Sequence, residues 1–294
     1  MTDGALHRLS AFTTSPEGGN PAGVWIGDRL PAAAEMQRIA KQVGFSETAF
    51  LAPAHGRRRT VRYYSPEAEV PFCGHATIAA GVQLAWLDGE GAYAFETAAG
   101  EVAVDVRTAD GLPAASLTSV EPRHRPPPIG LVYEVLATLG WSADELDSSI
   151  PPALAFAGAW HLVLAAARAE RLARLDYDFH ALKALMLKEG ITTLQLVWRE
   201  EGGVFHARNP FPVGGVVEDP ATGAAAAALG GYLRDAKLIA APATIVIRQG
   251  EAMGRPSRLL VEIPAAGGIV VRGHAVRLDP AGDFAHFWTR RSRT

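Results

Sequence analysis

Among the side chains that could carry a proton, Glu47 has the most suggestive surroundings. It stands near the start of an apolar run, residues 45–51, which is expected to form a short strand. Burial disfavours the charged form of a carboxyl group and brings its pKa towards the range in which a general acid/base works. The alternative interpretation is a surface glutamate at the edge of a strand.

Two runs of small residues, beginning at Cys73 and at Thr222, are expected to open helices. The first N–H groups of a helix have no partner inside it, so a helix start attracts anions such as carboxylates. His75 lies in the first turn of one helix, where a neutral imidazole could donate or accept a hydrogen bond. Asp219 precedes the other helix and could bind a hydroxyl or an amine. Either residue could instead simply cap its helix.

Cys73 is the single cysteine of the chain, which excludes an internal disulfide and suits a reducing compartment. A helix N-terminus favours the thiolate form of a cysteine, although a lone cysteine is often a packed small hydrophobic residue. We find no spaced set of metal ligands, no glycine-rich nucleotide motif and no Gly-x-Ser-x-Gly motif. The sequence therefore predicts neither a metal nor a cofactor.

The composition is that of a soluble globular protein. The 294 residues include 28 Lys and Arg against 31 Asp and Glu, which gives a net charge of -3, and 48% of residues are hydrophobic. The two basic runs, 57–59 and 290–293, are interpreted as solvated surface, so nucleic acid is not an expected partner. The longest apolar stretch, 153–167, is short for a membrane span, and residues 1–15 lack a signal pattern. We expect a cytoplasmic protein that does not bind membranes.

Strand patterns outnumber helix patterns and the two alternate irregularly, which predicts an α+β fold. The proline-rich stretch 121–128 is expected to be a linker between two domains, 1–120 and 129–278. The last dozen residues are expected to form a helix, and segment 279–294 is expected to complete the first domain.

The two predicted domains share an order of segments that suggests an internal repeat. Residues 19–25, 46–51, 61–66 and 73–77 match, in order and in character, residues 157–163, 192–197, 205–210 and 222–226. The repeat pairs Cys73 with Thr222 at the two helix starts. Two such halves would bring the helix starts face to face across a cleft that could hold an anionic group.

Five motifs in the same order along the chain carry a family resemblance. They are Gly19-Asn20-Pro21, Ser46-Glu47-Thr48-Ala49-Phe50, the segment 70–77 that contains Cys73-Gly74-His75, Glu218-Asp219-Pro220-Ala221-Thr222-Gly223, and the segment 249–257. Together they resemble the PhzF family of phenazine-biosynthesis-like isomerases. The resemblance implies a diaminopimelate-epimerase-like fold, with two similar domains that each wrap a curved, mostly antiparallel sheet around a central helix. It further implies an active site between the domains, no cofactor and commonly a homodimer.

The resemblance also implies a reaction and a set of site residues. The founding activity of the family isomerises trans-2,3-dihydro-3-hydroxyanthranilate by moving a proton, and the acid/base glutamate of the family falls on Glu47. Six residues at the two helix starts are expected to bind the substrate: Gly74, His75, Asp219, Thr222, Gly223 and Ala224. We therefore expect a cofactor-independent isomerase that acts on a small anionic, carboxylate-bearing metabolite.

Two positions limit this expectation. Diaminopimelate epimerase and proline racemase use two facing thiols, and here the counterpart of Cys73 is Thr222, so a two-thiol racemase is excluded. The family usually has a serine where this chain has Ala224, so the hydroxyl that could hold the founding substrate is missing. Two alternatives stay open: a relative with one cysteine that epimerises or racemises its substrate, and a binding protein that has kept the fold and lost the chemistry.

Overall fold

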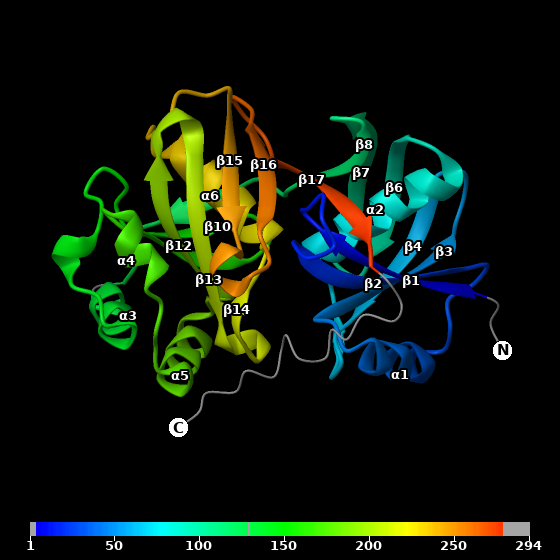
Figure 1. Ribbon diagram of the computed structural model, residues 1–294, viewed down its shortest axis with the longest axis horizontal. Coiled ribbons are helices and arrows are strands. Elements are labelled where there is room, and N and C mark those ends of the chain that lie inside the picture. Colours follow the sequence, from blue (N-terminus) through cyan, green and yellow to red (C-terminus); the bar gives the residue numbers. More distant parts are fainter. Residues whose placement is uncertain (1–3, 129, 279–294) are drawn as a thin grey trace. The chain divides into compact units, whose positions relative to one another are not determined.

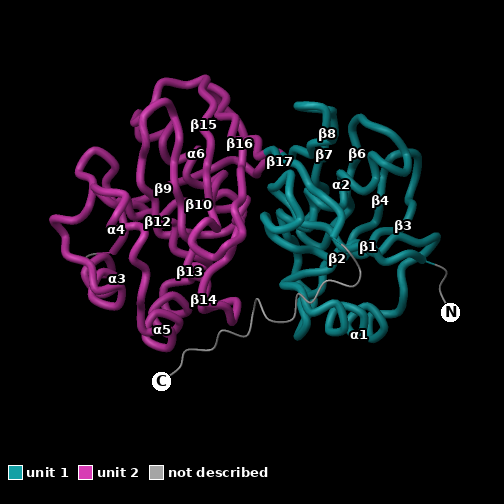
Figure 2. Tube along the Cα trace, viewed as in Figure 1, with its two compact units in different colours: residues 1–117, 272–294 teal, residues 118–271 magenta. Residues whose placement is uncertain are grey.

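The computed structural model describes residues 4–128 and 130–278, which divide into two compact units (Figures 1 and 2). Among the described residues, unit 1 comprises 4–117 and 272–278, and unit 2 comprises 118–271. The first unit thus ends at Leu117 rather than at residue 120, and residues 272–278, which were assigned to the second domain, belong to the first. The proposed helix at the end of the chain and the segment 279–294 lie outside the described residues.

Unit 1 is built from strands whose pairings form a closed ring. The strands are β1 (Gly4–Ala11), β2 (Asn20–Gly27), β3 (Glu47–Pro53), β4 (Arg58–Tyr64), β6 (Gly91–Thr97), β7 (Gly100–Ala109), β8 (Leu112–Thr118) and β17 (Val270–Arg277), with the short β5 (Glu69–Val70) beside β4. Neighbours pair in the order β1, β2, β3, β4, β6, β7, β8, β17, and β17 returns to β1. Only β2–β3 and β4–β6 are parallel within the pairs whose register is defined. A parallel pair needs a crossover, and helices α1 (Ala33–Val43) and α2 (Gly74–Asp88) provide the two crossovers.

Helix α2 is the central element of unit 1 (Figure 1). It is apolar around its whole circumference, and every residue from His75 to Leu84 is buried, as expected of a helix enclosed on all sides. Its largest strand contacts are with β1, β2, β3 and β7. Gly81 permits this close packing, because a Cβ atom there would lie 2.9 Å from Val104 Cγ1 and 3.0 Å from Ala115 Cβ. The packing holds the N-terminus of α2 in a fixed place.

Unit 2 contains a more open sheet. Its strands are β9 (Arg123–Arg125), β10 (Ala153–Phe156), β11 (Trp160–Ala165), β12 (Thr193–Glu200), β13 (Val204–Phe211), β14 (Val216–Asp219), β15 (Ala243–Gln249) and β16 (Ser257–Ile263). The sheet order is β9, β10, β11, β12, β13, β15, β16, and β14 pairs with β13 outside this series. As in unit 1, the two parallel pairs, β11–β12 and β13–β15, are the ones joined by helical crossovers.

The helices of unit 2 cover the two faces of this sheet. Helix α6 (Gly223–Asp235) contacts β9, β10, β11 and β16, in the way that α2 contacts its ring. Alternate residues of β11 face α6. Leu162 and Leu164 lie on the opposite face of the strand and belong to a separate apolar cluster. That cluster includes residues from α3 (Leu131–Leu139), α4 (Ala169–Ala173) and α5 (Phe179–Glu189). Short 3₁₀ helices lie at Ala143–Glu145, Glu201–Gly203, Pro212–Gly214 and Glu251–Met253.

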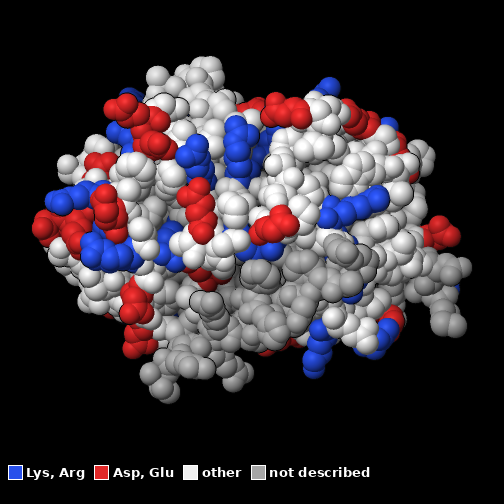
Figure 3. All heavy atoms as spheres, in the orientation of Figure 1, with Lys and Arg blue, Asp and Glu red and all other residues white. Residues whose placement is uncertain are grey.

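The prediction that residues 121–128 form a linker is wrong, because the centre of this segment is a strand. Residues 123–125 form β9, which pairs with β10 antiparallel, and His124 lies opposite Ala155. The prolines on either side of this strand produced the linker composition. The apolar stretch 153–167 forms the β10–β11 hairpin. No helix in the described part of the chain has the length and apolarity that a membrane span requires. The face drawn in Figure 3 carries acidic and basic side chains intermixed.

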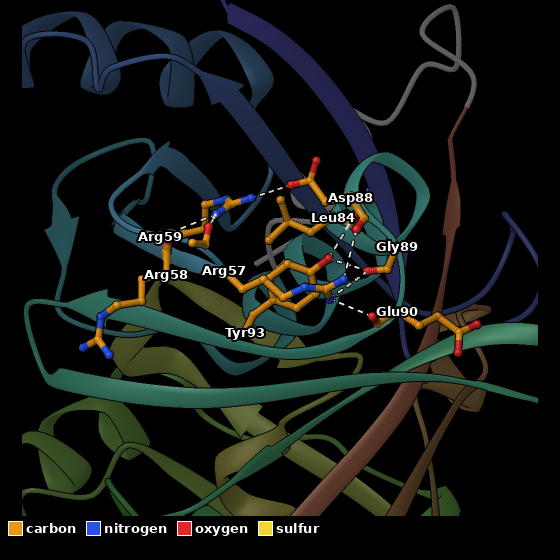
Figure 4. A network of polar contacts seen from close by, with 9 residues as sticks. Arg57, Arg58, Arg59, Leu84, Asp88, Gly89, Glu90 and Tyr93 are labelled. Carbon is orange, nitrogen blue, oxygen red and sulfur yellow. Dashed lines mark hydrogen bonds and ion pairs between the residues drawn. The ribbon is translucent and has the colours of Figure 1, made fainter.

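The basic run 57–59 is also more than a solvated surface, since two of its arginines bind the C-terminal end of α2 (Figure 4). Arg57 donates hydrogen bonds to the carbonyl groups of Asp88, Gly89 and Glu90, at 3.2, 3.3 and 2.6 Å. Its guanidinium also lies 4.9 Å from the centre of the Tyr93 ring. Arg59 is buried and forms an ion pair with the Asp88 carboxylate. A cation here satisfies carbonyl groups that the helix leaves without partners.

Replacing Arg57 with alanine is therefore expected to destabilise unit 1 by about 1 kcal/mol, because three carbonyl groups lose a charged donor. The measurement is the midpoint of urea unfolding followed by circular dichroism. Arg58→Ala is the matched control, because Arg58 pairs only with exposed Glu96 and Glu101 among its described ion pairs and such pairs contribute little. Equal losses in both variants would show that the bonds to the helix end have no special effect.

Candidate active site

Glu47, the candidate proton carrier, is held against the start of α2. It is the first residue of β3, which pairs in parallel with β2, and it lies opposite Ala22. Its Oε2 atom is 3.5 Å from Nε2 of His75, the second residue of α2. The Ser46 hydroxyl lies 3.3 Å from the same imidazole nitrogen. The Glu47 side chain remains 17% exposed and that of His75 only 7%, so a small molecule can reach the carboxylate while the imidazole stays enclosed.

The environment of His75 favours its neutral form. Burial lowers the pKa of this imidazole, and the nearby Glu47 carboxylate and a hydrogen bond to the Pro21 carbonyl oppose that effect without overcoming it. A neutral imidazole keeps one N–H donor and one acceptor nitrogen. With one ring nitrogen beside Glu47, His75 can orient the carboxylate without neutralising its charge.

Cys73 completes this group of side chains in unit 1. It is the N-cap residue of α2, and its Sγ atom lies 3.4 Å from Nδ1 and 3.9 Å from Nε2 of His75. One ligand atom each from Glu47, Cys73 and His75 fall within 4.8 Å of one another. We call these three residues the Glu–Cys–His cluster. No motif search could find it, because Glu47 reaches the other two through the fold and not through spacing along the chain.

The start of α2 is fixed by a short chain of buried hydrogen bonds. The Thr77 hydroxyl and the Thr77 N–H both donate to the Cys73 carbonyl, at 2.7 and 3.0 Å, and the Tyr63 hydroxyl lies 2.7 Å from the Thr77 hydroxyl. Burial raises the pKa of Tyr63, so the phenol stays protonated. The Cys73 side chain makes no capping bond to the first turn. The N–H groups of Gly74 and His75 can therefore serve an anionic ligand.

Unit 2 brings Asp219 and Thr222 together at the start of α6. Asp219 is the last residue of β14, and Thr222 is the N-cap residue of the helix. The Thr222 hydroxyl donates to Asp219 Oδ2 at 2.6 Å and makes no capping bond to the helix. Gly223 is the first helical residue, and the half-buried Ala224 follows it. At this helix start, as at that of α2, the N-cap side chain makes no capping hydrogen bond.

Gln249 is not among the expected site residues, yet it organises this second group. Its Nε2 donates to the Asp219 carbonyl at 2.8 Å and to the Thr222 hydroxyl at 3.0 Å, while its Oε1 accepts from the Thr222 N–H at 3.3 Å. Gln249 is the last residue of β15 and is buried. A glutamine that ends a strand and opens one of the matched motifs was the available signal. Its amide holds both Asp219 and Thr222 in place.

The position that corresponds to Glu47 in unit 2 carries no acid/base group. Register in the parallel strand pairs places Glu47 opposite Ala22 and Thr193 opposite His161. The Thr193 hydroxyl lies 2.8 Å from His161 Nδ1, and the Asn209 amide donates to the same hydroxyl. His161 is fully buried, and burial lowers its pKa to about 3. The two units thus differ at this strand position, where unit 1 has the carboxylate of Glu47 and unit 2 has the hydroxyl of Thr193.

The structure brings the expected site residues together in two sets. Glu47, Gly74 and His75 form one set in unit 1, and Asp219, Thr222, Gly223 and Ala224 form the other in unit 2. That both sets face one substrate stays a prediction.

The fold and the first set define a class: a mixed α+β protein with a carboxylate and a neutral imidazole at a central helix start. The family model for phenazine biosynthesis-like proteins, PhzC-PhzF, matches residues 9–280. A trans-2,3-dihydro-3-hydroxyanthranilate isomerase from Pseudomonas fluorescens is 32% identical over 260 residues, which are 86% of this chain and 88% of that protein.

Two solved structures show the same fold. A PhzF-family phenazine biosynthesis protein from Bacillus anthracis superimposes with a TM-score of 0.83 at 23% identity, over 95% of this chain and 98% of that one. A hydroxyproline epimerase from Agrobacterium vitis gives 0.63 at 15% identity, over 93% and 90%. The chain belongs to the PhzC-PhzF family of phenazine biosynthesis-like proteins. It is an isomerase of the PhzF type.

Proposed function

We propose that Glu47 moves a proton between two carbon atoms of a small carboxylate-bearing substrate. The carboxylate takes the proton from an acidic carbon, and a neighbouring double bond of the substrate moves to that carbon. The same carboxylate then returns the proton to the carbon at the far end of the original double bond. The observation that carries this proposal is the contact between Glu47 Oε2 and the buried His75 imidazole at the N-terminus of α2. One carboxylate with an orienting neutral imidazole is suited to transfer by a single base.

The helix starts have a separate role in this mechanism. Backbone N–H groups at Gly74 and Gly223 bind the substrate's carboxylate and stabilise the negative charge that develops during transfer. The Asp219 carboxylate accepts a hydrogen bond from a hydroxyl or an amine of the substrate, and Thr222 and Gln249 keep that carboxylate in position. The finer description of the fold, two related epimerase-like halves, is part of this proposal, as are the homodimer and the cytoplasmic location.

Trans-2,3-dihydro-3-hydroxyanthranilate is the first substrate to test, because the P. fluorescens relative is named for it. Deuterium at the transferred position of the substrate separates the two enzymatic mechanisms. A single base is expected to return part of the label to the product, whereas an epimerase with Cys73 or His75 as a second base would introduce solvent hydrogen. Complete loss of the label at the earliest turnovers would count against a single base.

Ala224 is expected to limit activity on this particular substrate. Its half-buried methyl group stands at the second position of α6, where a serine would add a donor beside the helix start. Ala224→Ser is expected to raise kcat/KM on trans-2,3-dihydro-3-hydroxyanthranilate by roughly tenfold, the effect of one hydrogen bond to a charged or strongly polar group.

The control for this prediction is Ala236→Ser, at the half-buried C-cap of the same helix. It adds the same hydroxyl far from the helix start and is expected to leave kcat/KM unchanged. An equal response in both variants would show that position 224 does not select the substrate. If the parent and Ala224→Ser both bind a small carboxylate-bearing compound but neither converts it, the protein is a binding protein without catalytic activity.

A further inference from the structure

The Glu–Cys–His cluster is also a set of metal ligands. A carboxylate, a thiol and an imidazole are the side-chain types that bind Zn²⁺, with bonds of about 2.0–2.3 Å in tetrahedral geometry. Such bonds separate neighbouring ligand atoms by roughly 3.3–3.8 Å. In the cluster, His75 Nε2 lies 3.5 Å from Glu47 Oε2 and 3.9 Å from Cys73 Sγ. The Cys73 sulfur lies closer to Nδ1, at 3.4 Å, and the three ligand atoms fall within 4.8 Å of one another, so the thiol must rotate towards Nε2 for all three side chains to share one ion.

The surroundings of the cluster match those of a metal centre. Cys73 and His75 are 8% and 6% exposed, and the Glu47 side chain is 17% exposed, so the ligands are shielded while an ion can still enter. The N-terminus of α2 favours negative charge on the Cys73 sulfur.

We propose that Glu47, Cys73 and His75 bind one divalent cation of the Zn²⁺ class, with a fourth position left open. The thiol and the imidazole favour Zn²⁺ or Co²⁺ over Mg²⁺ and Ca²⁺, which prefer oxygen ligands. The ion would coordinate the Glu47 carboxylate, which could then no longer accept the proton, so the ion would inhibit the isomerase. This last step rests on the proposed function of Glu47, whereas the binding itself rests only on the geometry of the three side chains.

Co²⁺ added to the full-length protein provides the direct test, because a cobalt–thiolate bond gives a near-ultraviolet absorption band and a tetrahedral ion gives visible bands. We expect one Co²⁺ per chain, displaced by Zn²⁺. Cys73→Ser is expected to lose the near-ultraviolet band, and Glu47→Gln is expected to weaken binding by at least roughly tenfold. Circular dichroism of each variant checks that it folds.

The control variant is His206→Gln. His206 lies 3.0 Å from a Glu200 carboxylate oxygen and 3.3 Å from one of Glu251, without a thiol nearby among the described residues, so it is the obvious competing histidine. It is expected to leave the cobalt spectrum and the affinity unchanged. A spectrum without the thiolate band, or affinity that falls with His206→Gln and not with the cluster variants, would overturn the metal site.

Inhibition of turnover by Zn²⁺, reversed by a chelator, tests the second step. If cobalt binds to the cluster without inhibiting turnover, the metal site is supported and the role of Glu47 in the reaction is contradicted. If Glu47→Gln loses turnover but the parent protein binds no cobalt, the role of Glu47 is supported and the metal site is contradicted. The two proposals can therefore fail independently.

Discussion

Glutamine in place of Glu47 is expected to lower kcat by roughly 10²–10⁴-fold, the contribution of a positioned general acid/base. The amide has the shape of the carboxylate but cannot take a proton from carbon. The side chain stands at the beginning of β3, partly exposed, and its described ion pair is with a histidine that is already mostly neutral. The fold should therefore survive the change, and KM should change much less than kcat.

The measurement is steady-state turnover with trans-2,3-dihydro-3-hydroxyanthranilate or with any substrate that the parent enzyme accepts. Glu69→Gln is the matched control, because Glu69 belongs to the same unit and pairs with Arg62 outside the cluster. It is expected to keep the turnover of the parent. Undiminished turnover in Glu47→Gln would end the role of this residue as the proton carrier, whatever the effect on binding.

Local patterns were sufficient to predict the elements that carry this candidate site. The small apolar residues after Cys73 and after Thr222 predict helices that pack closely on all sides, and both helices begin at the next residue. The glutamate in an apolar run predicts a strand start, and Glu47 is the first residue of β3. These predictions succeed because each depends on composition within a few turns or one strand.

Interactions across the fold could not be predicted in this way. Residues 123–125 have the composition of a linker and become strand β9 only because β10 lies beside them. The Arg57 guanidinium is polar, and nothing in the sequence shows that the end of α2 will lie within its reach. The role of Gln249 likewise depends on the loop between Asp219 and Thr222.

The internal repeat shows the same limit at the level of single residues. The sequence match of Cys73 with Thr222 agrees with the structure, in which both are N-cap residues. The matches of 46–51 with 192–197 and of 19–25 with 157–163 differ by one position in register, because Ala22 lies opposite Glu47 and His161 lies opposite Thr193. The β1–β2 connection spans residues 12–19, whereas the β10–β11 connection spans only 157–159. An alignment of the two halves therefore needs a gap, and one sequence cannot show where that gap belongs.

His161 is the basis of a second large effect, on stability at acid pH. Burial lowers its folded pKa from 6.5 to about 3, and the described residues offer no hydrogen-bond partner to its Nε2. Between these two pKa values the unfolded chain binds a proton at this residue and the folded chain does not. The stabilisation that neutral His161 contributes is therefore fully present above pH 6.5 and is lost as the pH falls towards 3.

Removing this titration should flatten the acid side of the stability profile. At about pH 4.5, two units below the unfolded pKa, linkage at His161 should cost about 2.7 kcal/mol relative to about pH 8. His161→Gln can keep a hydrogen bond to Thr193 and cannot titrate. It should therefore lose about that much less than the parent over the same interval, even if it is less stable at neutral pH.

Urea unfolding at several pH values, followed by circular dichroism, measures the difference. His55→Gln is the control, because His55 is exposed in the turn before β4 and should leave the shape of the profile unchanged. A profile for His161→Gln that runs parallel to that of the parent would mean that His161 takes up its proton in the folded state at ordinary pH. The imidazole would then have a charged or hydrated environment, and the buried group formed by His161, Thr193 and Asn209 would have to open to water at mildly acidic pH.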